Sequence, residues 1–319
     1  MARVVFFGTP PEALPSLAAL CGAGHEVALV VTAPDAPAGR GQKPKAPPVK
    51  KAALSLGLPL IQPERASAPE AAERISAAGP DALVVVAFGQ ILSRSLLAVP
   101  RWGGVNVHFS LLPEWRGAAP LEHALLAGAR RVGVSIVRMT AKMDAGPVLG
   151  SAVCAVRDCD DRGTLKVRLA RLGADLLLGG LSRLERGLVG QVGQDHSRAS
   201  YAPKVAEEAY LLDWSRPAEA VASVVRAASP IPGAWTQLGG RRLKFYCATV
   251  LESDEPLPAP GRVVAVVEDG VVVAAGDGAL LLREGQLEGR KRMPGAALAQ
   301  GLRLRPGDRV SDEWPPREG

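Results

Sequence analysis

Short apolar runs alternate with segments of helical periodicity along the N-terminal part of the chain. The apolar runs that predict strands are Val4–Phe7, Val27–Val31, Leu58–Ile61, Leu83–Ala87, Val105–Phe109 and Val134–Met139. Several of them are apolar throughout, which is typical of strands buried on both faces of a parallel sheet. Helical patterns lie between them near residues 10–22, 48–56, 68–78, 119–127 and 164–185. This alternation predicts an α/β fold with a Rossmann-like, mostly parallel sheet.

The first predicted helix has a defined start. Thr9 occupies the N-cap position, Pro10 the first helical position, and Glu12 stands three residues after the cap. Threonine and glutamate at this spacing form a capping box, and a proline at the first position loses no helical hydrogen bond. We therefore expect Thr9 to cap a helix that begins at Pro10.

The periodic pattern lapses after residue 187, and a second domain is expected beyond it. Glycines and polar residues indicate a linker there. The elements expected next are a helix over Pro217–Ala228 and strands over Arg242–Val250, Gly261–Val267, Val271–Ala275 and Ala279–Leu287. The turns Asp269-Gly270 and Gly276-Asp277-Gly278 favour hairpins, so this half is predicted to be a small OB-like β-barrel. The predicted division is a domain at 1–188, a linker at 189–207 and a second domain at 208–319.

Charge and cysteine content narrow the class of protein. The formal net charge of +6 favours a polyanionic partner, of which nucleic acid is the usual one. The four cysteines show no paired spacing, so neither disulfides nor a zinc site is expected, and a reducing cytoplasm fits them best. No apolar run reaches the ~18 residues of a membrane span, so no membrane partner is expected.

Common motifs of α/β enzymes are missing from the sequence. The first strand is followed by Gly8-Thr9-Pro10-Pro11-Glu12 rather than by G-x-G-x-x-G, and no G-x-x-x-x-G-K-[S/T] occurs. No G-x-S-x-G elbow occurs either. These absences argue against a dinucleotide oxidoreductase, an ATPase and the common serine hydrolases.

Polar residues interrupt one of the apolar strands. Asn106 and His108 alternate with valines, and the period of two places both side chains on the same face. Polar groups on a core strand are costly unless they are satisfied or used, so the alternatives are a hydrogen-bonded pair and a functional site. Asp144, within Met143–Pro147, could by itself be only the acceptor of a local turn.

The combination of these segments resembles the folate-dependent formyltransferases. The residues that carry the resemblance are Asn-x-His-x-Ser-Leu-Leu-Pro-x-Trp-Arg-Gly-Ala-x-Pro at 106–120 and Met-Asp-x-Gly-Pro at 143–147. Gly8-Thr9-Pro10 and Ala87–Leu92 extend it over the N-terminal domain. The resemblance is greatest to the branch that formylates methionyl-tRNA, where it continues into the C-terminal domain.

The resemblance implies a reaction and roles for three residues. An amine would attack the formyl carbon of 10-formyltetrahydrofolate, giving a tetrahedral intermediate with an oxyanion. Asn106 is expected to bind the oxyanion, and His108 to stabilise it and to transfer a proton. Asp144 is expected to orient His108 and to shuttle the proton. No metal is required.

Two segments are expected to hold the folate co-substrate. The loop of Ser110, Leu111, Leu112 and Pro113 is similar to the folate-contacting loop of the family. Backbone groups near Gln90, Ile91 and Leu92 are expected to hold the pterin edge. For Ile91 and Leu92 the alternative is ordinary packing.

The acceptor is suggested by a basic loop after the second strand. Residues 32–51 contain Arg40, Lys43, Lys45, Lys50 and Lys51, and prolines and glycines are expected to prevent regular structure through most of it. The resemblance implies that Arg40, Lys43 and Lys45 bind RNA, so methionyl-initiator tRNA is the expected partner of a monomeric enzyme. A solvated charge run is the alternative for the loop. For the whole protein the alternatives are an amino-sugar formyltransferase and a formyl-folate hydrolase.

Basic clusters of the C-terminal half could add phosphate contacts. They are Arg241, Arg242 and Lys244 on one segment and Arg290, Lys291 and Arg292 on another. For single residues, solvated surface remains the alternative.

Overall fold

The computed structural model describes residues 1–38, 43–187, 193–252 and 256–310, which divide into two compact units. The N-terminal unit comprises Met1–Pro120, Arg131–Ala155 and Lys166–Pro203. The C-terminal unit comprises Leu121–Arg130, Val156–Leu165 and the described residues from Lys204 onward. The chain thus passes for the last time from the N-terminal to the C-terminal unit between Pro203 and Lys204, inside the predicted linker. The boundaries at 188 and 208 stay predictions.

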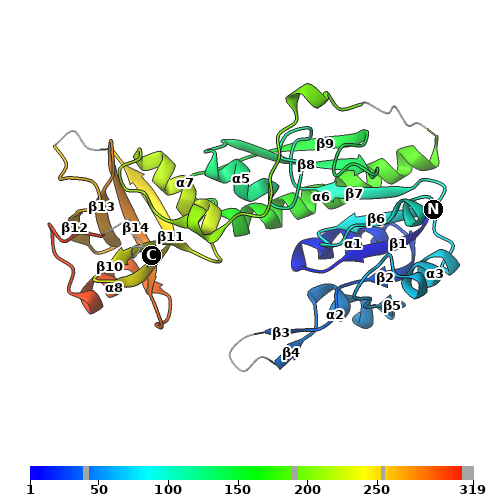
Figure 1. Cartoon of the computed structure of the whole chain (residues 1–319), viewed down its shortest axis with the longest axis horizontal. Coiled ribbons are helices and arrows are strands. Elements are labelled where there is room, and N and C mark those ends of the chain that lie inside the picture. Colours follow the sequence, from blue (N-terminus) through cyan, green and yellow to red (C-terminus); the bar gives the residue numbers. More distant parts are fainter. Residues whose placement is uncertain (39–42, 188–192, 253–255, 311–319) are drawn as a thin grey trace, which may run out of the picture. The chain divides into compact units, whose positions relative to one another are not determined.

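The N-terminal unit is built on a seven-stranded sheet in the order β5-β2-β1-β6-β7-β8-β9 (Figure 1). Its strands are β1 (Arg3–Gly8), β2 (Glu26–Val31), β5 (Leu60–Ile61), β6 (Ala82–Val86), β7 (Gly104–His108), β8 (Arg131–Arg138) and β9 (Val148–Ala155). The pairings from β5 to β7 are parallel, whereas β8 and β9 pair antiparallel. The mostly parallel, Rossmann-like sheet is confirmed. The sequence did not predict β9, whose small and half-exposed residues give no clear strand pattern.

Helices and short 3-10 turns connect these strands. The α-helices that begin in this part of the chain are α1 (Leu14–Gly22), α2 (Pro48–Ser55), α3 (Pro69–Ala77), α4 (Arg94–Leu97), α5 (Pro120–Leu126) and α6 (Arg162–Glu185). The 3-10 turns are η1 (Pro11–Ala13) and η2 (His196–Arg198). Gly173 lets α6 approach the sheet closely, because a Cβ there would lie 2.7 Å from Val107 Cγ1.

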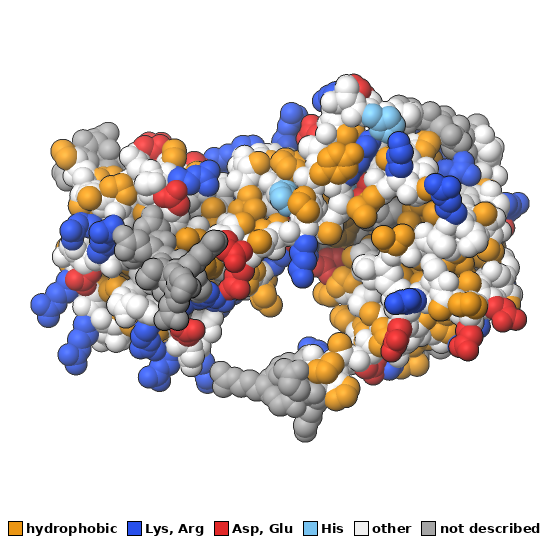
Figure 2. Space-filling model, viewed as in Figure 1, with side chains coloured by type: hydrophobic (Ala, Val, Ile, Leu, Met, Phe, Trp, Pro, Cys, Tyr) orange, Lys and Arg blue, Asp and Glu red, His pale blue; other side chains and the backbone are white. Residues whose placement is uncertain are grey.

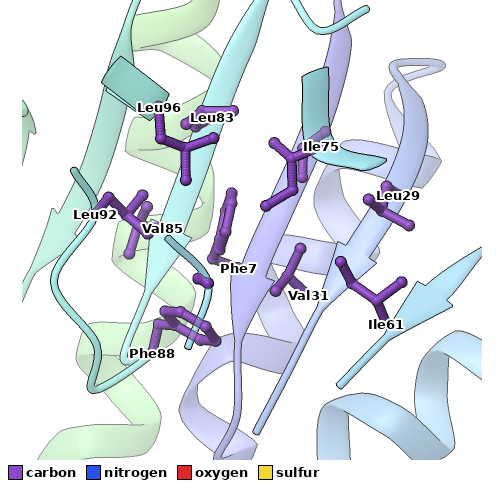
Figure 3. Packing of buried hydrophobic residues seen from close by; sticks show 12 residues of the cluster. Phe7, Leu29, Val31, Ile61, Ile75, Leu83, Val85, Phe88, Leu92 and Leu96 are labelled. Atoms are coloured by element: carbon purple, nitrogen blue, oxygen red, sulfur yellow. The ribbon is translucent and has the colours of Figure 1, made fainter. Parts of the chain in front are cut away.

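A buried apolar cluster ties one face of the sheet to the loop after β6 (Figure 3). Phe7 of β1 is fully buried and meets Phe88 edge-on, with ring centroids 5.3 Å apart and an interplanar angle of 71°. Leu92 and Leu96 belong to the same cluster. Both ends of the segment 88–92 are therefore anchored in the core, which fixes the predicted folate-binding residues between them.

The predicted cap of the first helix is wrong. A 3-10 turn over Pro11–Ala13 precedes α1, and its N-cap residue is Pro10 without a side-chain cap. The hydroxyl of Thr9 instead accepts a hydrogen bond from the Ala33 N–H at 3.3 Å. Thr9 thus joins the loops after β1 and β2. Its hydroxyl makes this tertiary contact and not the predicted cap of the helix.

The basic loop contains regular structure, contrary to the prediction. Its described part forms a two-stranded antiparallel hairpin of β3 (Ala36–Ala38) and β4 (Lys43–Lys45). At its base the Lys50 ammonium pairs with Asp35 at 2.8 Å, and Gln62 donates to the same carboxylate at 2.7 Å. The hydrogen bonds from Gln62 and Lys50 lower the pKa of Asp35. Lys50 is therefore bound to the hairpin's base.

The C-terminal unit is built on an antiparallel sheet in the order β10-β11-β14-β13-β12, with β15 paired to β14 (Figure 1). The elements are η3 (Glu207–Tyr210), α7 (Ala218–Ala228), β10 (Ala234–Leu238), β11 (Arg241–Leu251), β12 (Val263–Val267), β13 (Gly270–Ala274), β14 (Ala279–Leu287), β15 (Met293–Pro294) and α8 (Gly295–Leu302). The predicted helix and strands are confirmed within a few residues, while β10, β15 and α8 were not predicted. Trp214 is a buried centre of this unit, and its indole N–H donates to Thr236 Oγ1 at 3.1 Å.

Within the described ranges, no helix combines the length and the apolar character that crossing a membrane requires.

Candidate active site

Strand β7 presents Asn106 and His108 on one face of the sheet. Asn106 is half-buried and pairs with Val137 of β8, while His108 is 5% exposed and pairs with Ser135. Both side chains contact Asp144, so the prediction that they share a face is confirmed. The period of two along the strand causes this placement.

Asp144 completes a polar cluster with these two residues. Its Oδ1 accepts a hydrogen bond from Asn106 Nδ2 at 3.3 Å, and its Oδ2 lies 3.7 Å from His108 Nδ1. The Gly117 N–H also donates to Oδ2, at 2.9 Å. The side chains of His108 and Asp144 are only 6% and 12% exposed, so their interaction is little weakened by solvent.

Asp144 reaches this cluster because its loop folds back along β7. Strand β8 is antiparallel to β7, and its end lies beside the start of β7, where the Met139 N–H donates to the Gly104 carbonyl at 2.8 Å. The chain must therefore return toward the carboxyl end of β7 for Asp144 to meet His108. The backbone of Asp144 is left-handed, with φ of 50°. An L residue rarely adopts this conformation without support from its surroundings.

The imidazole of His108 bridges Asp144 and the following loop. Its Nε2 lies 3.1 Å from the carbonyl oxygen of Trp115. A carbonyl oxygen can only accept, so Nε2 carries a hydrogen and Nδ1 faces the carboxylate of Asp144. The ring is thus held by the hydrogen bond of Nε2, and the 3.7 Å between Nδ1 and Oδ2 must shorten before a proton can pass between them.

Gly117 joins the polar cluster of Asn106, His108 and Asp144 to the segment around Ala202. Its φ is 125°, and a Cβ there would lie 2.6 Å from the carbonyl oxygen of Ala202. The same residue donates its N–H to Asp144. Only glycine fits both the backbone conformation and the close approach.

Gly117→Ala is therefore expected to lower the free energy of unfolding by about 1–3 kcal/mol, because the methyl group must displace backbone atoms. Chemical denaturation measures it. Gly179→Ala is the matched control, since Gly179 lies exposed in α6 with nothing near its Cβ position. The control is expected to be stabilised by about 0.5–1 kcal/mol, as alanine favours a helix. Equal stability of Gly117→Ala and the unchanged protein would contradict the close approach.

Ser135 of β8 holds the predicted folate loop through two hydrogen bonds. Ser135 Oγ donates to the Ser110 carbonyl at 2.7 Å and accepts from the Leu112 N–H at 3.1 Å. Ser110 Oγ donates to the Glu114 carbonyl at 2.6 Å, which closes the loop on itself. Leu111, Leu112 and Pro113 are half-buried. Ser135 was not among the predicted site residues, although a serine in the centre of an apolar strand was the available signal.

The other predicted folate residues lie in the segment after β6. The side chain of Gln90 binds the neighbouring loop, accepting from the Ala66 N–H at 2.7 Å and donating to the Pro63 carbonyl at 3.4 Å. Ile91 is 81% exposed, whereas Leu92 is 5% exposed and packs in the core. Ordinary packing, the alternative to folate binding, therefore explains the side chain of Leu92. Packing does not explain the side chain of Ile91, which is exposed to solvent.

The predicted RNA-binding residues belong to the basic hairpin. Arg40 lies outside the described residues. Lys43 and Lys45 belong to β4, and the side chain of Lys45 is exposed. Arg116, the arginine of the motif at 106–120, is buried and hydrogen-bonded to Gln194 and His196.

The described residues do not gather three or more His, Cys, Asp or Glu side chains in a place that could hold a metal ion.

Comparison with known proteins assigns the chain to a family. The sequence model of the family described as Formyl transferase matches residues 2–180, and that of Formyl transferase, C-terminal domain, matches residues 204–303. The methionyl-tRNA formyltransferase of Thiobacillus denitrificans is 46% identical over 97% of this chain and 99% of its own length. This chain belongs to the methionyl-tRNA formyltransferase family. Another member, from Symbiobacterium thermophilum, is 44% identical over 100% of this chain and 98% of its own length.

Solved structures show that the formyltransferase fold extends over both units. HypX from Aquifex aeolicus, solved in complex with tetrahydrofolic acid, superposes with a TM-score of 0.68 at 19% identity, over 97% of this chain and 50% of HypX. The methionyl-tRNA formyltransferase from Clostridium thermocellum gives a TM-score of 0.57 at 12% identity, over 80% of this chain and 96% of that protein. These identities are low, so the likeness concerns the fold alone.

Proposed function

We propose that this chain transfers the formyl group of 10-formyltetrahydrofolate to the free amino group of methionyl-initiator tRNA. The observation that carries the proposal is the convergence of Asn106, His108 and Asp144 in one shielded cluster. The family of the chain adds the reaction type, because its relatives along nearly the full length are methionyl-tRNA formyltransferases.

The proposed reaction is nucleophilic substitution at the formyl carbon. The amine nitrogen forms a bond to this carbon, the carbonyl electron pair moves to oxygen, and a tetrahedral intermediate results. When the oxyanion collapses, the bond to N10 of the folate breaks and that nitrogen takes up the proton which the amine releases. The products are formyl-methionyl-tRNA and tetrahydrofolate. Catalysis requires donors for the oxyanion and a path for the proton.

The geometry of the cluster suits both requirements. An Asn amide has two N–H donors, of which one is used by Asp144, so the other N–H of Asn106 serves the oxyanion. His108 supports the oxyanion electrostatically. Asp144 orients the imidazole of His108. The carboxylate of Asp144 and Nδ1 of His108 together carry the proton from the amine to the folate.

The donor is proposed to lie along two loops at the carboxyl ends of neighbouring strands. The loop of 110–113 follows β7, and Gln90, Ile91 and Leu92 follow β6. Because β6 and β7 are parallel neighbours, these loops leave the same edge of the sheet. The exposed side chain of Ile91 would cover an apolar face of the folate, and the backbone of the segment would bind the pterin edge.

The tRNA acceptor is proposed to bind at the basic hairpin and on the C-terminal unit. Lys43 and Lys45 share β4, and Arg40 lies in the same predicted basic loop. In Figure 2 lysine and arginine side chains gather on the C-terminal unit. Exposed cations of that unit include Arg241, Arg290 and Lys291. Positive charge of this kind binds the phosphate backbone without reading its sequence.

Lys45→Glu is expected to raise the KM for methionyl-tRNA while kcat stays within about twofold, since a phosphate contact positions the substrate and leaves the chemistry unchanged. The slope of log KM against the logarithm of the salt concentration is expected to decrease by about 1. Lys51→Glu, the same charge change on an exposed position of α2, is the control and is expected to raise KM less. Equal effects of the two substitutions would argue against a specific contact in the hairpin.

Two rival functions differ from the proposed one only in the acceptor. With an amino sugar as the acceptor the enzyme would be an amino-sugar formyltransferase, and with water it would be a formyl-folate hydrolase. The proposal is tested by following consumption of 10-formyltetrahydrofolate with and without methionyl-initiator tRNA. A transferase for this acceptor consumes the donor only when the charged tRNA is present, in a ratio of one donor to one formylated tRNA. Consumption without any acceptor would instead identify a hydrolase.

We further propose that the enzyme acts as a monomer in the cytoplasm, where its charged tRNA is made and used.

A further inference from the structure

A stretch of the predicted linker lies against the catalytic loop of the N-terminal unit. Arg116 and Tyr201 form a parallel bridge. The Arg116 N–H donates to the Ser200 carbonyl at 2.8 Å, and the Ala202 N–H donates to the Arg116 carbonyl at 2.7 Å. The Trp115 N–H donates to Ser200 Oγ at 2.8 Å. Residues 200–202 are therefore paired, through an isolated bridge, with the loop that carries Gly117.

The side chain of Gln194 connects the same segment to Asp144. Its Nε2 donates to the carbonyl oxygens of Asp144, at 2.8 Å, and of Gly146, at 2.6 Å. Its Oε1 accepts from the guanidinium of Arg116, at 3.2 Å from Nε and 2.7 Å from Nη2. Both donors and the acceptor of the amide are thus used. Arg116, which is only 4% exposed, also lies 2.9 Å from His196 Nδ1, while Gln194 itself is half-buried.

The turn that Gln194 binds needs such support. Asp144 has a left-handed backbone, and a Cβ at Gly146 would lie 1.8 Å from the Arg138 carbonyl oxygen. The turn is therefore both unusual in conformation and tightly packed on one side, and Gln194 holds it on another. A displacement of about 1 Å in a catalytic group can reduce a rate about 100-fold.

We propose that Gln194, held by Arg116, is a positioning residue for formyl transfer: it fixes the backbone at Asp144 so that the carboxylate meets Asn106 and His108. The inference rests on the proposed function. It makes residues 194–202 a part of the active site, although the sequence pattern indicated only a linker there.

Gln194→Met tests the proposal, because methionine keeps the length of the side chain but removes its donors and acceptor. The kcat for formyl transfer is expected to fall about 10- to 100-fold, with each KM within about threefold. In an Asp144→Asn background, the same substitution is expected to lower kcat by less than about twofold, since Gln194 acts through Asp144. Losses that multiply in the double variant, or a rise in KM at constant kcat, would overturn the proposal.

A second variant and a control separate positioning from folding. Gln194→Glu keeps the acceptor for Arg116 but loses both donors to the turn, so it is expected to reduce kcat as much as Gln194→Met while unfolding closer to the temperature of the unchanged protein. Gln300→Met makes the same chemical change on the exposed part of α8 and is expected to leave kcat unaltered. Loss of kcat in Gln194→Met without loss in Gln194→Glu would show that the Arg116 contact, and not the turn, matters.

Hydrogen exchange at the Gly117 amide distinguishes this inference from the proposed function, because it needs no substrate. This N–H donates to Asp144 Oδ2 and reports the position of the carboxylate. Gln194→Met is expected to raise its exchange rate at least about tenfold. An unchanged exchange rate would overturn the positioning role, even in a protein that formylates methionyl-tRNA. Faster exchange in a protein that formylates nothing would contradict the proposed function alone.

Discussion

Asn106→Ala is expected to lower the kcat of formyl transfer about 100- to 1,000-fold, which is the usual effect of removing one oxyanion donor. The amide is held by Asp144 through one N–H, so its other N–H is already oriented when charge develops on the formyl oxygen. This interaction forms only in the transition state, and the KM values for folate and tRNA are therefore expected to change little. Single-turnover kinetics with saturating substrates measure the effect.

Asn106→Gln is the control for this substitution, because it keeps the amide but moves it by one methylene group. Its kcat is expected to lie between those of the unchanged protein and of Asn106→Ala. Thermal unfolding of both variants shows whether the sheet is intact. A kcat of Asn106→Ala within about fivefold of the unchanged enzyme would contradict the role of Asn106 in oxyanion binding.

Asp144→Asn is expected to lower kcat about 100- to 10,000-fold, the range typical of positioned proton transfer. An amide cannot take up and release the proton that the amine loses. Its NH2 group must also face a donor, either the Gly117 N–H at the Oδ2 position or Asn106 Nδ2 at the Oδ1 position, so one hydrogen bond of the cluster is lost. The geometry of the cluster is then disturbed together with the proton path.

Asp213→Asn is the matched control for the carboxylate. Asp213 accepts from the Ser215 N–H in a turn of the C-terminal unit, and an amide oxygen can still accept that bond. Its kcat is expected to remain within about twofold of the unchanged enzyme, as surface substitutions usually have small effects. If Asp144→Asn were as active as Asp213→Asn, the account of proton transfer would be wrong.

The elements that were predictable from the sequence are those in which local pattern and tertiary packing agree. Continuous apolar runs identified the strands of the parallel sheet, because such strands are buried on both faces. The alternation of Asn106 and His108 with valines fixed their common face without any knowledge of the partner strand. These features depend on neighbouring residues, which a sequence displays directly.

Features that depend on distant residues were not predictable in the same way. Thr9 matched a capping box, yet its hydroxyl binds Ala33, which lies on another loop. Ser135 supports the proposed folate loop from the middle of β8, and Gln194, which follows α6 in the sequence, binds the backbone of Asp144. Small residues in β9 and the hairpin of β3 and β4 carry little periodicity. The contacts of Thr9, Ser135 and Gln194 each join segments that are far apart in the chain.

The most direct test of the proposed function offers the enzyme three alternative acceptors with one labelled donor. Formyl-labelled 10-formyltetrahydrofolate would be mixed with methionyl-initiator tRNA, an elongator methionyl-tRNA and a nucleotide-linked amino sugar, each in a separate reaction at equal concentration. We expect rapid labelling of the initiator tRNA and far slower labelling of the elongator tRNA and the sugar. Labelling of the amino sugar in preference to the initiator tRNA would keep the catalytic cluster but contradict the assignment of RNA as the acceptor.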